Sequence, residues 1–252
     1  MQSLFIAFSM YSRLPVPHTE WNEENMAYAL CWFPFVGFIL GIIELAAFSC
    51  LEMFGAGPVF KGAVLACLPV FITGGIHLDG FMDTADARSS FADRKRKLDI
   101  LKDSHVGSFA VIHLAVYMML SMGAWSMADR QTAMIMCCTF VIERAVSALA
   151  AINIKGARED GMLAAFTVPA KKKTVSVILA FIACGGAMIS AYIWSTGGLI
   201  CISAVMIMLL LYRHMALNEF GGVTGDLAGW FLQVCELTVL MALIIYKMGA
   251  AL

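Results

Sequence analysis

Apolar residues run along this chain in stretches long enough to cross a lipid bilayer, and short polar segments separate them. A membrane-spanning helix needs about 20 consecutive, mainly apolar residues. The pattern therefore predicts an all-α polytopic membrane protein with about seven transmembrane helices, of which the sixth is the weakest. The runs lie near residues 28–54, 58–78, 106–127, 131–153, 174–195, 197–213 and 227–250.

The N-terminal stretch MQSLFIAFSMYSRLPVP precedes the first of these runs. Its apolar part is too short to span a membrane, and it lacks the basic start and the cleavage site of a signal peptide. We expect a short interfacial or re-entrant helix that ends at Pro15 and Pro17, because proline interrupts helical hydrogen bonding. No linker, repeat or low-complexity segment divides the chain, which predicts a single integral membrane catalytic domain over residues 1–252.

The positive charges are distributed unevenly among the polar segments. Segments 86–105 and 155–173 are rich in Lys and Arg, whereas 55–57, 128–130 and 195–198 carry only Asp129 and Arg130 as charged residues. Basic loops of membrane proteins stay in the cytoplasm. The distribution predicts a multi-pass protein of the cytoplasmic (inner) membrane, with its N-terminus inside and its C-terminus outside.

The composition agrees with a lipid bilayer as the surroundings. Hydrophobic residues make up 61% of the chain and charged residues 14%, against about 25% charged residues in soluble domains. The net charge of −1 gives no field that would attract nucleic acid. All eight cysteines lie in apolar runs without metal-ligand spacing, so we expect buried thiols and neither a zinc site nor disulfides.

Three aspartates follow the second apolar run, in the stretch GGIHLDGFMDTADARSSF. If that span continues as a helix through residue 86, Asp79, Asp83 and Asp86 share one face, within roughly 60° of arc. Carboxylates held so close repel one another unless a cation or a proton joins them. Oxygen donors suit hard cations, so we expect this aspartate cluster to bind Mg²⁺ or Mn²⁺.

Further polar residues around the aspartate cluster extend the candidate site. Asp103, before the third span, is either a helix cap, a role that Ser104 could also fill, or a fourth metal ligand. Arg88 follows Asp86 closely and suits a phosphate, while the basic run 94–97 is typical of a topology signal and could also meet anionic lipid headgroups. Metal, carboxylates and cations together indicate diphosphate chemistry, in which a free carboxylate takes the proton of an attacking hydroxyl.

These motifs resemble a known family. The segments RLPVP (13–17), FPFVG (33–37), GGIHLDGFMDTADA (74–87), KDSHVGSF (102–109) and GGVTGD (221–226) occur in this order. The chain is similar to the cobalamin synthase family, the adenosylcobinamide-GDP ribazoletransferases, over nearly its whole length. Ala87 is a departure, because the family usually has glycine after DTAD, and this bears on the shape of loop 87–97.

The resemblance implies a Mg²⁺-dependent phosphotransferase of a late step of cobalamin biosynthesis. Its substrates would be adenosylcobinamide-GDP and α-ribazole or its 5′-phosphate, and its products GMP and adenosylcobalamin or its 5′-phosphate. We assign Asp79, Asp83, Asp86 and Asp103 to metal binding and catalysis, with the active site facing the cytoplasm. The substrate-binding candidates are Arg88, Lys102, Arg144 and Asp226; a homo-oligomer is left open.

Other charged residues within the apolar runs have two interpretations. Arg144 either binds a phosphate or corrinoid amide or pairs with Glu44, and Glu143 and Glu236 need protein partners as well. Asp226 in GGVTGD either contributes its charge to the site or caps the last helix, with the glycines forming an anion-binding turn. For His77 we favour a hydrogen-bonded interfacial side chain over a ligand.

Three alternatives remain on sequence grounds. One is an enzyme like the CDP-alcohol phosphotransferases, which share an Asp-rich motif and the Ala87–Arg88 pair. Another is an intramembrane prenyltransferase, which would release pyrophosphate. The third is an ion-coupled transporter with Glu44, Glu143, Arg144 and Glu236 as its relay, although the chain shows no paired broken spans in two halves.

Overall fold

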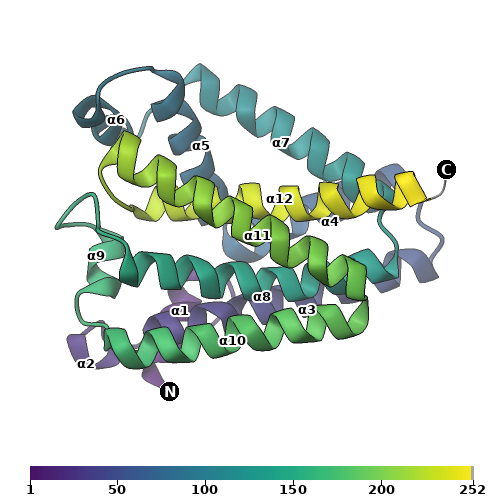
Figure 1. Cartoon of the computed structure of the whole chain (residues 1–252), viewed down its shortest axis with the longest axis horizontal. Helices are drawn as coiled ribbons and strands as arrows, with labels where there is room; N and C mark the ends of the chain where they lie inside the picture. The colour runs from purple at the N-terminus through teal and green to yellow at the C-terminus, as the bar shows by residue number, and fades with distance from the viewer. Residues whose placement is uncertain (251–252) are drawn as a thin grey trace.

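The computed structural model describes residues 1–250 of the chain as an all-helical bundle (Figure 1). No β-strand occurs among them, and one isolated parallel bridge joins Gly156 to Val223. Six helical segments are long and apolar enough to cross a membrane, or seven if one sharply bent pair counts as a span. This confirms the predicted all-α polytopic membrane protein. The long helices are α3 (Phe33–Met53), α7 (Ser108–Met127), α8 (Arg130–Asn153), α10 (Lys172–Ile193), α11 (Ser195–Met215) and α12 (Gly225–Ala250).

Shorter helices occupy the N-terminus and the connections. An N-terminal helix of ten residues, α1, ends at Tyr11, before the prolines, and is too short to span. The backbone N–H of Arg13 then donates to the carbonyl of Ile72 at 2.7 Å, which ties the segment after α1 to the bundle. Together with α1 (Gln2–Tyr11), the short elements of this group are α2 (Glu23–Met26), η1 (Ala29–Trp32), α6 (Arg94–Ile100), α9 (Met162–Thr167) and the π-helical turn η2 (Ala216–Phe220).

The second predicted span is broken, and this corrects the expectation of one helix through residue 86. Helix α4 (Pro58–Thr73) and helix α5 (Ile76–Ser89) meet at an angle of 98°. Gly74 and Gly75 lie between them with φ of +68° and +79°. This left-handed conformation is open to glycine at no steric cost, so the consecutive glycines turn the chain. The aspartate cluster therefore lies on a helix of its own.

The core of the bundle is built around α8. This helix is buried along most of its length and packs against α3, α10, α11 and α12, while α10 and α7 leave large apolar side chains exposed, as lipid-facing helices do. Close helix approach depends on small residues: a side chain at Gly37 of α3 would collide with the carbonyl of Phe140 in α8 at 2.2 Å. Such contacts are typical of helices packed within a bilayer.

The polar connections divide between the two ends of the bundle. The segments 90–107, 154–171 and 216–224 gather at the end where α6 and α9 lie, and the connections 54–57, 128–129 and the end of α12 lie at the other (Figure 1). The predicted basic loops thus share one end. That this end faces the cytoplasm stays a prediction.

Candidate active site

Helix α5 presents the aspartate cluster at the end of the bundle that carries the basic loops. Asp79, Asp83 and Asp86 all lie within Ile76–Ser89, so one helix carries them with the spacing that the sequence predicted. Asp79 is exposed, and Asp83 and Asp86 are half-buried. The opposite face of α5 is buried, with Leu78 and Phe81 packed near Tyr117 of α7. That packing orients the carboxylates away from the core.

Asp226 of α12 joins the three carboxylates across a close helix crossing. A side chain at Gly80 would lie 2.7 Å from the carbonyl oxygen of Asp226, and one at Gly229 would lie 2.8 Å from that of His77. These glycines let the two backbones meet. The negative charges of Asp79, Asp226 and Asp86 lie close enough to Asp83 to repel its carboxylate, with the effect decreasing in that order. We call Asp79, Asp83, Asp86 and Asp226 the four-aspartate site.

Asp226 is not the cap of its helix, which corrects that alternative. The cap is Thr224, whose hydroxyl oxygen accepts the N–H of Leu227 at 3.2 Å, while Asp226 lies in the first turn of α12. Gly222 lies so close to the carbonyl of Lys155 that a side chain there would approach to 2.4 Å. The backbones of 155–157 and Val223 exchange hydrogen bonds of 2.9 and 3.0 Å, and this pins the loop before Asp226.

The chemistry of these donors fits a hard divalent cation. None of the four carboxylates forms an ion pair with a described basic residue, so no basic side chain competes with a cation for them. Within residues 1–250, however, no three acidic, histidine or cysteine side chains converge closely enough to hold a metal alone. Mg²⁺ is commonly bound by one or two carboxylates together with waters and substrate phosphates. The arrangement suits a cation that arrives with a diphosphate.

The loop before α7 contributes a glycine to the site, and Asp103 points elsewhere. Gly107 lies directly against the carboxylate of Asp86, because a side chain there would meet both oxygens at 2.1 Å. Asp103 accepts hydrogen bonds from the backbone and ring of His105, at 3.0 and 2.7 Å, and these bonds lower the pKa of its carboxyl group. The cap of α7 is Gly107, so neither Asp103 nor Ser104 caps it.

Two of the predicted basic ligands, Arg88 and Lys102, already have acidic partners. Arg88 pairs with Glu219 of η2 at 3.2 Å, with its guanidinium over the ring of Trp230 at 5.7 Å. Glu219 also binds Lys97 at 2.7 Å. Lys102 reaches Asp160 only loosely, at 4.0 Å between exposed side chains. Glu219 thus links η2 to α5 and α6. This role was not foreseen, because one glutamate at the end of a span has no distinctive sequence pattern.

Two pockets meet at Asp226. The larger, which we call the polar basin, has a volume of about 520 Å³ and is bordered by Lys155, Arg158, Lys172 and Asp226. Arg158 donates to the carbonyl of Leu98 and acts electrostatically on Asp226. The sequence of segment 155–173 indicated only its topology, so Arg158 was not foreseen as a site residue. The basin places cations beside the four-aspartate site.

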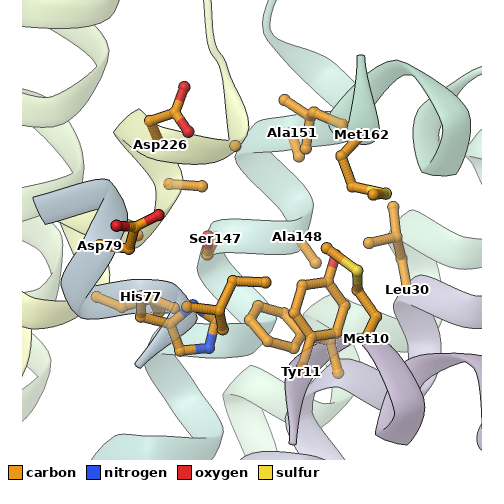
Figure 2. Close-up of a pocket in the computed structure, with 17 residues that line it drawn as sticks. Met10, Tyr11, Leu30, His77, Asp79, Ser147, Ala148, Ala151, Met162 and Asp226 are labelled. Carbon is orange, nitrogen blue, oxygen red and sulfur yellow. The ribbon is translucent and has the colours of Figure 1, made fainter. Parts of the chain in front are cut away.

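The smaller pocket, which we call the inner pocket, extends from Asp79 and Asp226 into the bundle. Its volume is about 140 Å³, and it lies between the end of α1, the start of α5, and helices α8, α9 and α12. Figure 2 shows the two aspartates on one side and Leu30 and Met162 on the other, with Tyr11 and His77 below. Most of its lining is apolar.

His77 is buried, not interfacial, and this corrects the expectation for it. It is 5% exposed, and its Nε2 has no hydrogen-bond partner among the described residues. The ring lies 6.0 Å from that of Tyr11 and 5.7 Å from that of Phe33, measured between centroids. The N-terminal helix supplies Tyr11, a contact that could not be foreseen from the sequence.

The intramembrane charges form a separate group in the core. Arg144 is fully buried, donates to Glu143 at 2.6 Å and lies 3.5 Å from Glu236. The pair with Glu44, one of the two alternatives for Arg144, is absent, and both carboxylate oxygens of Glu44 lack hydrogen-bond partners among the described residues. The long Arg144 side chain thus reaches back to its neighbour in the helix, Glu143. Arg144 borders neither the polar basin nor the inner pocket.

Comparisons with known proteins give a consistent result. A family model described as cobalamin-5-phosphate synthase matches residues 3–244. Proteins named adenosylcobinamide-GDP ribazoletransferase are similar over nearly the full length of both chains. One from Lachnoclostridium phytofermentans is 39% identical over 248 residues, which cover 97% of this chain and 94% of that protein. Relatives from Clostridium botulinum (strain Eklund 17B) and Acinetobacter baumannii (strain ATCC 17978) are 30% and 29% identical, each over 96% of both chains. No solved structure matches.

Proposed function

The chain belongs to the cobalamin-5-phosphate synthase family, and on that premise we propose that it joins adenosylcobinamide-GDP to α-ribazole or its 5′-phosphate. The reaction releases GMP and yields adenosylcobalamin or its 5′-phosphate. Family membership makes the protein a transferase of cobalamin synthesis. The specific substrates are proposed from the names of its relatives and from the chemistry of the site.

One observation carries the proposal: four aspartates without basic partners lie together where α5 crosses α12, beside a basin bordered by cations. Diphosphate substrates bring negative charge that such a site binds through a divalent cation and basic side chains. Asp79, Asp83, Asp86 and Asp226 would share the binding of Mg²⁺ with the diphosphate, because no three of them converge to hold the ion alone. Bound there, Mg²⁺ supplies neutralisation of the charge that develops on the phosphates.

In the reaction, a ribose hydroxyl of the acceptor attacks the phosphorus that carries the aminopropanol arm of the corrinoid. The new P–O bond forms as the bond to the oxygen of GMP breaks, and GMP leaves with the bonding electrons. One carboxylate of the four-aspartate site takes the proton of the attacking hydroxyl. Arg158 and Lys155 in the polar basin stabilise the leaving nucleotide. Asp103 would contribute only after a loop movement, since its carboxylate binds His105.

The proposed orientation places this site at the cytoplasmic face of the inner membrane. The basic loops gather at the end of the bundle that carries the four-aspartate site (Figure 1). Cytoplasmic loops are enriched in Lys and Arg. Nucleotides and Mg²⁺ are supplied from that side, so the orientation suits the substrates.

The test is release of GMP by the purified protein in detergent. GMP should form only when adenosylcobinamide-GDP, α-ribazole and Mg²⁺ are all present. A CDP-alcohol with a free alcohol, and a prenyl diphosphate with the same acceptor, serve as competing substrates. Release of CMP or pyrophosphate from these, without GMP from the first mixture, would overturn the proposal.

A further inference from the structure

The inner pocket has walls suited to a flat apolar molecule. Its cavity of about 140 Å³ is lined mainly by aliphatic side chains from several separate helices. Apolar cavities of about this size, near 150 Å³, take up a benzene ring. The main aliphatic contacts are Met10, Leu30, Ala148, Ala151, Met162 and Leu163.

Two aromatic side chains give the pocket a polar element within this apolar lining. Tyr11 and His77 lie nearly parallel, with an interplanar angle of 22° (Figure 2). The imidazole forms no hydrogen bond with a described residue, although Nε2 is buried. A buried polar group normally has a partner, and its absence is costly. His77 therefore retains the capacity to bind one polar atom of a ligand.

The inner pocket reaches the aspartates of the proposed reaction. Asp79 and Asp226 line it, and Ala151, Met162 and Asp226 also border the polar basin. A ligand that fills the pocket must therefore project its remaining part toward the four-aspartate site. A nucleoside bound by its base would place its sugar there.

Only one part of the two substrates matches these walls. Guanine has several polar edge atoms that need partners, and beyond Asp79 and Asp226, which belong to the four-aspartate site, the pocket offers only Tyr11, His77 and Ser147. A corrin ring is far larger than the cavity. The base of α-ribazole is a planar, methyl-substituted fused ring with a single unsubstituted nitrogen. It matches walls that are mainly apolar and that include an imidazole without a hydrogen-bond partner among the described residues.

We propose that the inner pocket binds the base of the acceptor nucleoside, with His77 donating a hydrogen bond to its unsubstituted ring nitrogen. This inference rests on the function proposed above. It makes Ala148 and Met162 determinants of base size. The guanine nucleotide of the other substrate would then bind in the polar basin, on the other side of Asp226.

The first test fills the pocket. Ala148→Leu adds bulk to a wall residue that is 2% exposed, and Ala180→Leu makes the same change at an exposed, lipid-facing position of α10. For Ala148→Leu, we expect KM for α-ribazole to rise at least tenfold while KM for adenosylcobinamide-GDP stays within twofold. Ala180→Leu should leave both constants unchanged. The rise in KM caused by Ala148→Leu should be at least fivefold smaller with the α-riboside of unmethylated benzimidazole, because that base is smaller.

The second test enlarges the pocket and does not depend on an overpacked core. Met162→Ala shortens a side chain that is 49% exposed, so folding should persist. This variant should use the bulkier α-riboside of naphthimidazole at least fivefold better, relative to α-ribazole, than the wild type does. Equal effects on all acceptors, or a raised KM for the corrinoid nucleotide alone, would overturn the inference. Absence of GMP with the wild type would instead overturn the proposed function, and the inference with it.

Discussion

Gly80 of α5 lies against the backbone of Asp226 in α12, so closely that a β-carbon at residue 80 would be 2.7 Å from the carbonyl oxygen of Asp226. These residues are far apart in sequence, and each belongs to a different motif. Their contact unites the DGFMDTAD and GGVTGD segments into one acidic site. The proposed active site is therefore a helix crossing, and its geometry depends on a glycine as much as on the carboxylates.

Gly80→Ala should impair both stability and activity, because the added methyl group meets backbone atoms that cannot rotate away. Overpacking of this kind costs about 1–3 kcal/mol. Thermal unfolding in detergent and the rate of GMP release measure the two effects. Gly123→Ala on α7 is the matched control, since a side chain there meets nothing within 4 Å. If Gly80→Ala behaved like this control, the close crossing would not hold in the protein.

Asp226→Asn should lower turnover at least tenfold, equivalent to about 1.4 kcal/mol of transition-state stabilisation, with little change in thermal stability. Asn preserves the shape of the side chain, and Thr224 provides the cap, so only the charge is lost. Thr224→Ala is the informative contrast, because loss of a cap costs about 1 kcal/mol of stability. An Asp226→Asn protein with full activity would remove this residue from the site.

Arg144→Met should destabilise the protein strongly. Removal of one partner from a buried ion pair costs about 3–5 kcal/mol, because the remaining charges lose their compensation. Here Glu143 and Glu236 would be left beside each other in the core. Unfolding by denaturant measures the loss. A stable Arg144→Met protein with a raised KM for either substrate would instead support the sequence-based assignment of Arg144 to substrate binding.

Cysteine labelling can establish the orientation of the bundle. In a variant without native cysteines, Asp93→Cys and Lys171→Cys should react with a membrane-impermeant maleimide only from the cytoplasmic side. Ala56→Cys, in the connection at the opposite end, should react only from outside. The reverse pattern would separate the four-aspartate site from its nucleotides.

Much of the architecture was predictable because lipid imposes one rule on the whole chain: backbone groups must bond within helices. The apolar runs and the basic loops therefore gave the spans and their grouping at the two ends. The break at Gly74 and Gly75 was missed, although a glycine pair is a turn signal, because the apolar run continues past it to residue 78.

The site was predictable only in the part that one helix encodes. The spacing of Asp79, Asp83 and Asp86 is a local property, and the structure keeps all three on α5. The approach of Asp226, the contact of Gly107 with Asp86 and the position of Tyr11 beside His77 are tertiary, and a single sequence has no period that encodes them. For the same reason, the His105 partner of Asp103 was not foreseen.

The most direct test of the account is the Mg²⁺ dependence of GMP release by the wild type and by Asp79→Asn, Asp83→Asn and Asp86→Asn. Asparagine keeps the size of each side chain and removes the charge that a cation needs. Chelation should abolish release by the wild type, added Mg²⁺ should restore it, and each variant should lose orders of magnitude in turnover while still inserting in the membrane. Near-normal turnover of any variant at low Mg²⁺ would show that the residue is no ligand, and wild-type release that persists under chelation would contradict the account.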